Sequence, residues 1–375
     1  MSVSLFVGSA EEEEFRADVI RFISEYRGLN GFHFQGSKWP EVKALYRAIG
    51  QCGWMSIGWS DAAGGLGRSA VREFILWDEM AYARVARPPL GAGIVAKTLI
   101  AHGTEAQKQK WLPPIRAGEK FFSLGYSEPG AGSDLAGLST RADLHGDHYV
   151  VTGEKCWTSY AQDSDYLWTL VRTGAVEDRG RGLSLMILDL HAPGVSVRPL
   201  PTIDGEQLNQ VVLDAVEVPV EHRIGPENAA WRLVKDALDV ERHVQFPPAR
   251  LRRDLEELVA WLRKHEHELD PVVQRTVAAL GVGVFEVEAL ALLVLESVVK
   301  GRPGDVEAAQ NKLAHAELSQ KIARAPFELG LSEALIYGPI EFLYRQSTWE
   351  TIGGGTSEIM RSVVARQGLG LGGRS

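Results

Sequence analysis

Hydrophobic residues recur at helical spacing through the first third of the chain. Phe15, Val19 and Phe22 lie three or four positions apart, and this spacing places side chains on one face of an α-helix. Breaks are predicted at residues 38–40, where a proline follows Lys-Trp, and at the glycine-rich residues 63–67. The pattern therefore predicts a helical region from about residue 11 to about residue 119.

One helix start within this region can be predicted from its capping residues. His102-Gly103 is a typical helix end, and the Thr104-Glu105 that follows is a typical start. Gln107 stands three positions after Thr104 and completes a sequence of the capping-box type. A new helix is expected to begin here.

The hydrophobic period changes towards two between about residues 120 and 225. Short runs rich in β-branched and aromatic residues are separated by Gly or Asp, a pattern typical of short strands joined by turns. This middle region is predicted to be an antiparallel barrel or sandwich. The runs are 149–152, 166–171, 183–188, 195–197 and 211–213.

From Pro226 onward the pattern is helical again, with long amphipathic stretches up to Arg366 and a predicted break at Pro303-Gly304. The order of helices, strands and helices predicts an α+β multidomain protein. We expect an N-terminal helical domain at residues 1–119, a β-domain at 120–225 and a C-terminal helical bundle at 226–375.

Composition narrows the class of protein. A chain of 375 residues suggests two or three packed domains. Its net charge of -9, from 40 basic and 49 acidic residues, argues against nucleic acid as the main partner. Two cysteines are too few for a disulfide framework, and residues 1–7 lack the basic start of a secretion signal. We also expect no apolar run long enough to span a membrane, so a cytoplasmic protein is predicted.

The stretch Tyr126 to Asp134, Tyr-Ser-Glu-Pro-Gly-Ala-Gly-Ser-Asp, is predicted to be a turn at the end of a strand. Its Pro-Gly pair favours a tight turn, and Gly132 allows another molecule to approach the backbone closely. Ser127, Ser133 and the local N–H groups can hydrogen-bond a ring system or a phosphate without adding bulk. An ordinary polar loop between two strands is the alternative interpretation.

Several such segments, in this order, resemble the acyl-CoA dehydrogenase family of flavoproteins. The resemblance covers nearly the whole chain. The segments that carry it are residues 63–67, 102–108, 126–134, 157–159, 214–219 and 355–359.

The resemblance implies a fold, a cofactor and a reaction. The fold is an N-terminal helical domain, a middle β-domain and a C-terminal four-helix bundle, with FAD held between the last two. The flavin accepts a hydride from the β-carbon of an acyl thioester while a carboxylate removes the α-proton, which leaves a trans-2-enoyl thioester. An electron-transfer flavoprotein is the implied electron acceptor, and acyl-CoA is the implied substrate.

Cofactor-binding residues are carried over position by position. Tyr126 and Ser127 are expected at the isoalloxazine edge, and Gly132 and Ser133 along the flavin or the thioester. Trp157 is expected to pack on the ring system, with Ser159 hydrogen-bonding nearby. The alternative for Trp157 is a buried core aromatic, since a Trp beside a strand is often buried. Thr356 is expected to reach the flavin or its adenine side.

The catalytic base is expected away from its commonest position. Many members carry a Glu directly before Gly-Thr, whereas this chain has Gly354 in the run Gly353-Gly354-Gly355-Thr356. Leu238 to Arg242 resembles the isovaleryl-type and some steroid-side-chain members, whose base lies on this helix. We therefore predict Glu241 as the base, on one face with Trp231, Val234 and Leu238.

Other readings of the carboxylates stay open. Arg242 is predicted to support the site's geometry or charge balance. Glu241 and Arg242 could instead both be solvated on a surface helix, because adjacent helical residues do not face each other. Glu350 is a weaker candidate for the base and is expected to be a solvated helix carboxylate.

Two family segments that reach across a subunit interface to FAD are not matched. Residues 262–268 and 329–332 stand at their positions with different sequences. Some members of the family obtain these contacts by forming heteromers of two different subunits. We therefore predict an oligomer of this chain, homo- or heteromeric and a dimer or tetramer. Our hypothesis is that this chain is the base-bearing subunit of a heteromeric pair.

Alternative functions are a catalytically silent subunit, an acyl-CoA oxidase and an acyl-carrier-protein dehydrogenase. His243, His265 and His267 are expected to be solvated, since their spacing does not predict a metal site, and Cys156 is expected to be a small core residue. The sequence does not define the acyl group or its chain length. The loss of side-chain bulk at Gly353 to Gly355 is compatible with a large or branched one.

Overall fold

The computed structural model describes residues 5–26, 29, 38–67, 69–205, 207–239, 242–267 and 269–372. The chain divides into two compact units. One comprises Met1–Phe32, Ala70–Arg87 and Arg242–Ser375, and the other comprises His33–Ser69 and Pro88–Glu241. These units do not follow the predicted domain borders at 119/120 and 225/226, which remain predictions from the sequence.

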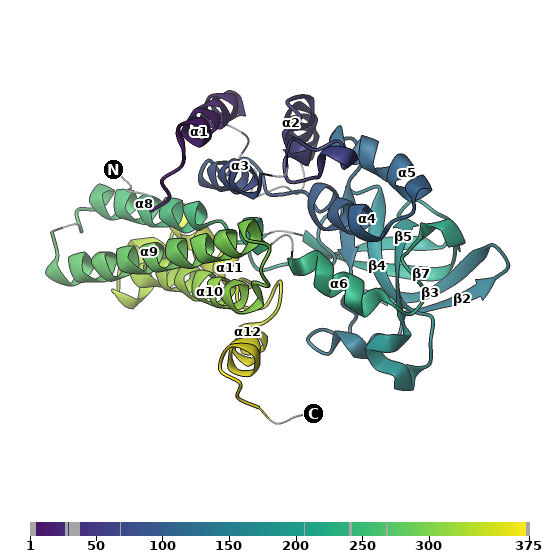
Figure 1. Ribbon diagram of the computed structural model, residues 1–375. Helices are drawn as coiled ribbons and strands as arrows, with labels where there is room; N and C mark the ends of the chain where they lie inside the picture. The colour runs from purple at the N-terminus through teal and green to yellow at the C-terminus, as the bar shows by residue number, and fades with distance from the viewer. Residues whose placement is uncertain are drawn as a thin grey trace. The chain divides into compact units, whose positions relative to one another are not determined.

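The first unit is built of helices. Its long helices α8, α9 and α10 lie side by side (Figure 1), and their facing leucines, valines and alanines form one buried core that includes Leu258, Val284 and Leu318. The helices are α1 (Ala10–Ile23), α3 (Ala70–Tyr82), α7 (Arg242–Gln245), α8 (Pro248–Lys264), α9 (Pro271–Val299), α10 (Asp305–Glu328), α11 (Pro339–Ser347) and α12 (Ser357–Val363).

Helix α3 explains why the N-terminal helices are divided between the units. Phe74 on α3 is buried with Ala291 and Leu295 on α9, and it forms a core cluster separate from that of the sheet. Burial of such a side chain stabilises the packed helices by about 2 kcal/mol. The predicted N-terminal helical region is thus present, but part of it packs with the C-terminal helices.

The second unit combines four helices with a β-sheet. The rings of Trp111 and Tyr166 meet edge-on with centroids 4.8 Å apart, and this contact fixes α5 against strand β4. The helices are α2 (Trp39–Gln51), α4 (Ala96–His102), α5 (Glu105–Arg116) and α6 (Ala230–Asp239).

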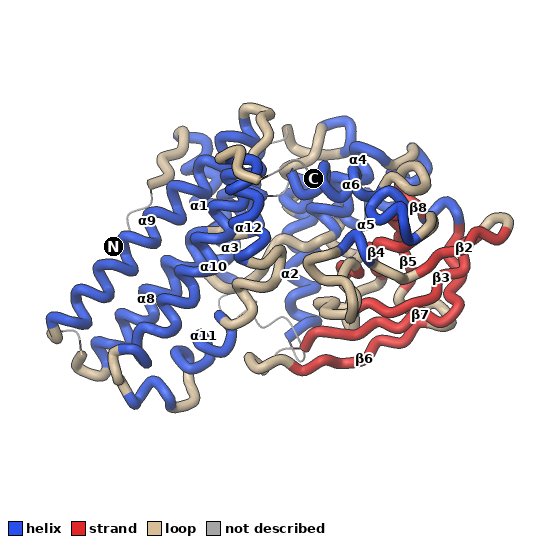
Figure 2. Tube along the Cα trace, turned by 90° about the horizontal axis from the view of Figure 1, so that it is seen from below, coloured by secondary structure: helices blue, strands red, loops and turns tan. Residues whose placement is uncertain are grey.

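One eight-stranded sheet carries the β-domain. Its strands run in the order β6-β7-β3-β2-β4-β5-β8 (Figure 2), and β1 pairs with β4 off this path. The strands are β1 (Phe122–Gly125), β2 (Arg141–His145), β3 (His148–Lys155), β4 (Tyr166–Arg172), β5 (Leu183–Asp189), β6 (Val195–Pro201), β7 (Gln207–Pro219) and β8 (Arg223–Ile224).

The predicted fold class is confirmed, with one correction to the sheet. The sheet is mixed rather than wholly antiparallel, because β4 pairs in parallel with both β1 and β2. The described strands also form an open sheet rather than a closed barrel. Parallel pairing needs a long connection between the strands, and residues 126–165 supply it for β1 and β4.

Predicted helix boundaries are also confirmed. Thr104 caps α5 by accepting a hydrogen bond from the Gln107 N–H at 3.2 Å, and the Gln107 side chain accepts one from the Thr104 N–H at 2.9 Å. The break at Pro303-Gly304 separates α9 from α10. Both cases rest on local backbone chemistry, which the sequence displays directly.

Helix α9 corrects the expectation that no apolar run is long enough for a membrane. It is the one described helix that is long and apolar enough to cross a bilayer, with a mean hydropathy of 2.1 over its most apolar window. A third of that window is buried in the fold, and core helices of soluble proteins meet the same criterion. The cytoplasmic location remains a prediction.

Candidate active site

The Tyr126–Asp134 segment leaves strand β1 and forms a tight turn. Backbone hydrogen bonds join Glu128 and Ala131 in both directions, at 3.0 and 3.1 Å. At its start the Tyr126 ring is buried, and its hydroxyl accepts a hydrogen bond from the Trp168 indole N–H at 3.1 Å. The turn is therefore fixed to the core of the sheet at its first residue.

A buried ion pair organises the turn. Lys155 at the end of β3 is 0% exposed, and its Nζ lies 2.8 Å from the carboxylate of Glu128, which is 5% exposed. The same carboxylate accepts hydrogen bonds from the Ser139 N–H at 2.6 Å and from the Thr140 N–H at 2.8 Å. One carboxylate thus joins the turn to strand β3 and to the segment before β2.

Both partners of this pair are charged at neutral pH. Burial disfavours the Glu128 carboxylate, but the Lys155 ammonium and the hydrogen bonds from Lys155, Thr140 and Ser139 outweigh it and lower the pKa of Glu128 to about 2. Burial lowers the pKa of Lys155 to about 8 although Glu128 acts to raise it. A buried charge is tolerated when it is paired and hydrogen-bonded, and this carboxylate is both.

A second buried cation holds the far end of the same loop. Arg172, at the end of β4, is 1% exposed. Its guanidinium donates to the carbonyl oxygens of Ala136 at 2.8 Å and of Leu138 at 2.9 Å. It also donates to the carbonyls of Ala175 at 3.0 Å and Arg179 at 3.1 Å. The loop is thereby restrained on both sides of Gly132 and Ser133.

The Trp157–Ser159 segment lies beside the turn. The Cys156 N–H donates to the Ser127 carbonyl at 2.9 Å. The Thr158 N–H donates to the Asn209 carbonyl at 2.9 Å, and the Asn209 side-chain amide donates to the Thr158 carbonyl at 2.9 Å. Trp157 itself has φ = +62° and is 60% exposed, which rules out the buried core interpretation. Such a backbone conformation is unusual for a bulky residue and is typical of functional sites.

The groups left available on this surface suit a flat cofactor with polar edges. Among the described residues, no hydrogen bond engages the hydroxyls of Ser127, Ser133 or Ser159. The buried Thr158 hydroxyl likewise has no partner there, and the space around Gly132 is open to 4 Å. Together with the exposed indole of Trp157, these donors and the bare backbone fit a flavin.

The expected residues divide between the two compact units. Tyr126, Ser127, Gly132, Ser133, Trp157 and Ser159 all belong to the unit that contains the sheet. Thr356 and Arg242 belong to the helical unit. Thr356 caps α12, and its hydroxyl accepts from the Ile359 N–H at 3.3 Å. Arg242 begins α7, and Glu241 lies outside the described residues.

Within the helical unit, the glycine turn packs against the segment that follows α7. Gly354 has φ = +68° and Gly355 has φ = +99°. A Cβ atom placed on Gly354 would lie 3.5 Å from Cζ of Phe246. Residue 354 therefore neighbours Phe246, which lies five residues after Glu241 in the chain.

Two expectations about solvated residues are wrong. Glu350 is 3% exposed and forms an ion pair with buried Arg250; burial favours its neutral form, but the Arg250 guanidinium outweighs this and lowers its pKa. His243 is also 3% exposed, and its Nε2 lies 3.0 Å from the carboxylate of Glu73. Residues brought in from distant helices bury both, and local charge patterns do not reveal such neighbours.

The remaining single residues need smaller corrections. Trp231 is 48% exposed, so the buried face of α6 runs through Ala230, Leu233 and Val234 instead. His265 packs on the Trp261 ring with centroids 4.4 Å apart, and Cys156 is half-buried. The described residues contain no group of three metal-ligating side chains.

The sequence interpretation missed the roles of Glu128 and Lys155. A signal was present for Lys155, because strand β3 buries Tyr149 and Val151 and leaves Val150 half-buried. Lys155 shares the odd-numbered face of that strand with Tyr149 and Val151. A lysine on an inward face calls for a buried partner, and Glu128 is the carboxylate within reach.

Comparison with known proteins covers almost the whole chain. The family model for the N-terminal domain of acyl-CoA dehydrogenases matches residues 9–119. The model for their middle domain matches residues 123–216, and the model for their C-terminal domain matches residues 228–369.

Similar individual proteins point to the same family as these domain models. The chain is 37% identical to acyl-CoA dehydrogenase FadE26 of Mycobacterium tuberculosis over 345 residues, which cover 86% of each protein. It resembles the solved structure of the Tcur3481-Tcur3483 steroid ACAD with a TM-score of 0.90 and 31% identity, over 98% of this chain and 99% of that one. The ChsE4-ChsE5 complex from Mycobacterium tuberculosis matches with a TM-score of 0.86 and 32% identity, over 100% of both chains.

Removal of the buried ammonium tests the importance of the ion pair. We expect Lys155→Met to destabilise the fold by about 3–5 kcal/mol, because Glu128 is left buried without its countercharge. The double variant Lys155→Met, Glu128→Gln should recover part of that loss. Urea denaturation measures both, and a single variant that unfolds at the wild-type urea concentration would contradict the assignment.

The ion pair also predicts a pH dependence. The pKa of Glu128 falls from 4.5 to about 2 in the folded state, so its contribution to stability is complete above about pH 4.5 and is lost as the pH falls towards 2. The difference in free energy of unfolding between wild type and Glu128→Gln should therefore shrink between pH 5 and pH 3. A difference that stays constant over this range would argue against a depressed pKa.

Proposed function

The chain belongs to the acyl-CoA dehydrogenase family, and on that premise we propose that it catalyses the FAD-dependent α,β-dehydrogenation of an acyl-CoA, with Glu241 as the base that removes the α-proton. The observation that carries the proposal is the turn of Tyr126 to Asp134. Its backbone is fixed by Glu128 and Lys155, while the hydroxyls of Ser127 and Ser133 and the Trp157 indole are left available.

Members of this family are FAD-binding flavoproteins. The bound flavin supplies hydride acceptance from the β-carbon of the substrate. The residues proposed to hold it are the Tyr126–Ser127 backbone, Gly132, Ser133, Trp157 and Ser159, together with Thr356. The protein's own part is to orient the thioester, to exclude water and to hold a base at the α-carbon.

Three observations support Glu241 over the other carboxylates. Gly354 has no side chain to accept a proton. Glu350 is paired with Arg250, and its lowered pKa makes it a weak base. Phe246 lies against Gly354, so the chain that follows Glu241 runs beside the position that the base occupies in many members.

We propose a bulky acyl group as the substrate class. The glycines of residues 353–355 present no side chains, and one relative of high structural similarity is titled a steroid ACAD. Flavin bleaching with a panel of straight, branched and ring-bearing acyl-CoAs tests this. Preference for short straight chains would argue against a bulky acyl group. Activity only with acyl-carrier-protein thioesters would show that the substrate is bound to a carrier protein and not to CoA.

An electron-transfer flavoprotein is the proposed electron acceptor. The alternative of an acyl-CoA oxidase makes a different prediction, since an oxidase would form hydrogen peroxide in the absence of any protein acceptor. Measuring peroxide beside the reduction of an added electron-transfer flavoprotein separates the two.

A heteromeric assembly is proposed as the working form. Two structurally similar proteins are named as pairs, the Tcur3481-Tcur3483 steroid ACAD and the ChsE4-ChsE5 complex. In this chain the two unmatched segments contribute to the bundle's own core, because Leu262 is buried there and Leu329 and Leu331 pack against it. These three leucines are committed to the core of the chain itself, and FAD contacts of the usual cross-subunit kind would come from a second subunit.

Substitution of the proposed base gives the direct functional test. Glu241→Gln should abolish substrate-dependent flavin bleaching, by at least about a thousandfold given the usual contribution of a general base, while FAD remains bound. Exposed Glu221→Gln is the matched control and should bleach like wild type. Bleaching at the wild-type rate in Glu241→Gln would reject this base, and a chain that never bleaches in any assembly would favour the silent-subunit alternative.

Cofactor stoichiometry tests the assembly. The chain purified alone should retain less than one FAD per chain, and co-expression with an encoded homologue from the same gene cluster should restore full binding. Light scattering gives the mass of each form. A homotetramer with one FAD per chain would contradict the heteromeric proposal and leave the dehydrogenase proposal intact.

A further inference from the structure

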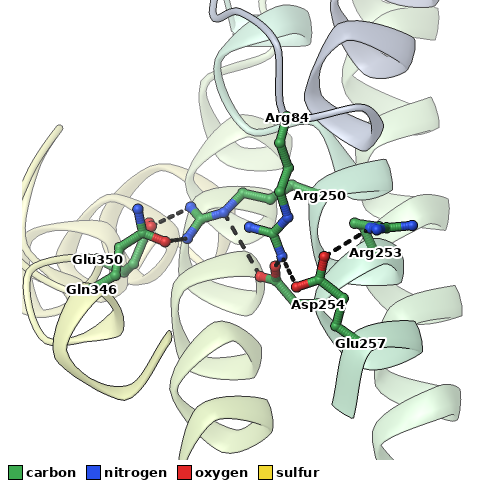
Figure 3. A network of polar contacts seen from close by, with 7 residues as sticks. All are labelled: Arg84, Arg250, Arg253, Asp254, Glu257, Gln346 and Glu350. Carbon is green, nitrogen blue, oxygen red and sulfur yellow. Dashed lines mark hydrogen bonds and ion pairs between the residues drawn. The ribbon is translucent and has the colours of Figure 1, made fainter. Parts of the chain in front are cut away.

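A buried network of charges surrounds the glycine turn of the helical unit, and the reaction proposed above does not use it. Arg250 on α8 is 5% exposed and Glu350 is 3% exposed. The Arg250 guanidinium donates to the Glu350 carboxylate and, at 3.4 Å, to Gln346 of α11 (Figure 3). The ion pair therefore joins the start of α8 to the residues that lead into the glycines.

The network continues across the unit from Arg250. Its Nε lies 3.8 Å from the carboxylate of Asp254, which also accepts a hydrogen bond from Arg84 (Figure 3). Arg84 has φ = +56° and follows α3, and it donates at 2.9 Å to Glu257 as well. Helices α3 and α8 and the turn are thus linked by alternating charges.

Two more side chains hold the backbone of the turn. Fully buried Lys312 on α10 donates from Nζ to the Glu350 carbonyl at 2.8 Å. Gln320, also on α10, donates to the Ser347 carbonyl at 3.1 Å and to the Thr351 hydroxyl at 3.2 Å. On the other side, the Ser357 N–H donates to the Thr351 carbonyl at 3.0 Å.

The turn needs such anchors because its own residues make few stabilising contacts. Gly353, Gly354 and Gly355 have no side chains to bury, and glycine loses more conformational freedom on ordering than other residues do. The contact between Gly354 and Phe246 then depends on what holds the turn from outside. Glu350 is the last charged anchor before the glycines, and Arg250 stands four residues after Phe246 in the chain.

We propose that the buried Arg250–Glu350 ion pair is a positioning device for the reaction. It fixes the turn of residues 351–355 against the start of α8, and it thereby sets the place of residues 242–247, which follow Glu241. Both residues act through the backbone and neither touches the substrate. The inference rests on the proposed function, because it concerns the placement of the proposed base.

An apolar replacement of the whole pair separates positioning from stability. Breaking one partner leaves a buried charge and destabilises the fold, whereas replacing both partners with apolar residues of similar volume is often neutral. The double variant Arg250→Met, Glu350→Leu should therefore melt close to wild type. Glu350→Gln keeps the shape and one acceptor, and it serves as a second variant if the double variant does not fold.

Two measurements on the FAD-loaded protein, in whichever assembly binds FAD, then test the role. We expect hydrogen exchange of the amides in residues 351–357 to accelerate at least about tenfold in both variants. Single-turnover bleaching by acyl-CoA should slow by about 10- to 100-fold, because small misplacements of reacting groups have effects of this size. The KM should change little. Arg263→Met, near the end of α8 and exposed, lies outside the network; it is the control and should behave like wild type.

Protected turn amides and wild-type bleaching in a folded double variant, or in Glu350→Gln, would overturn the inference. Its failure is distinguishable from failure of the proposed function. If Glu241→Gln bleaches normally, the base assignment is wrong whatever the ion pair does. If Glu241→Gln is inactive and the ion-pair variants bleach normally, only the positioning role is wrong.

Discussion

The ion pair between Glu128 and Lys155 is the interaction on which the candidate cofactor surface depends. Two full charges are removed from water to make it, and that cost is offset only because the carboxylate also accepts hydrogen bonds from Ser139 and Thr140. An apolar pair could fill the same space, but it could not bind two backbone N–H groups. The pair therefore fixes the path of the turn, and the positions of the Ser127 and Ser133 hydroxyls and of the bare backbone at Gly132 follow from that path.

The helical unit uses the same physical solution for a second glycine-rich turn. There Arg250 and Glu350 are buried together, and Lys312 binds the backbone of the turn. In both turns the residues between the anchors are mostly small or have no side chain, so they contribute little to their own order. Buried charges that bind the backbone or flank the turn supply that order.

Much of the fold could be predicted because its signals are local. The capping residues Thr104 and Gln107 and the break at Pro303-Gly304 depend on backbone chemistry within a few positions. The parallel pairing of β1 with β4 could not be predicted, because it depends on how a connection of some forty residues returns to the sheet. The packing of α3 on α9 could not be predicted for a similar reason, because Phe74 meets Ala291 and Leu295 only through tertiary packing.

The candidate site also has residues that the sequence predicts and residues that it does not. The turn, Trp157 and the missing side chain at Gly354 are visible in the sequence, so the cofactor class follows from it. Glu350 was expected in solvent as a helix carboxylate, and His243 because it lies on a charged helical stretch, whereas their partners Arg250 and Glu73 come from other helices. Burial of a charge depends on such distant partners, and one sequence does not display them.

Glu241 is the proposed α-proton base of this chain, which has Gly354 at the position that carries the base in many members of the family. Exchange of the α-hydrogens of an acyl-CoA with solvent deuterium, followed by NMR, tests this directly, because it detects proton removal separately from hydride transfer. We expect exchange with the FAD-loaded wild-type protein and none above background with Glu241→Gln. Equal exchange in both proteins would show that another group removes the proton.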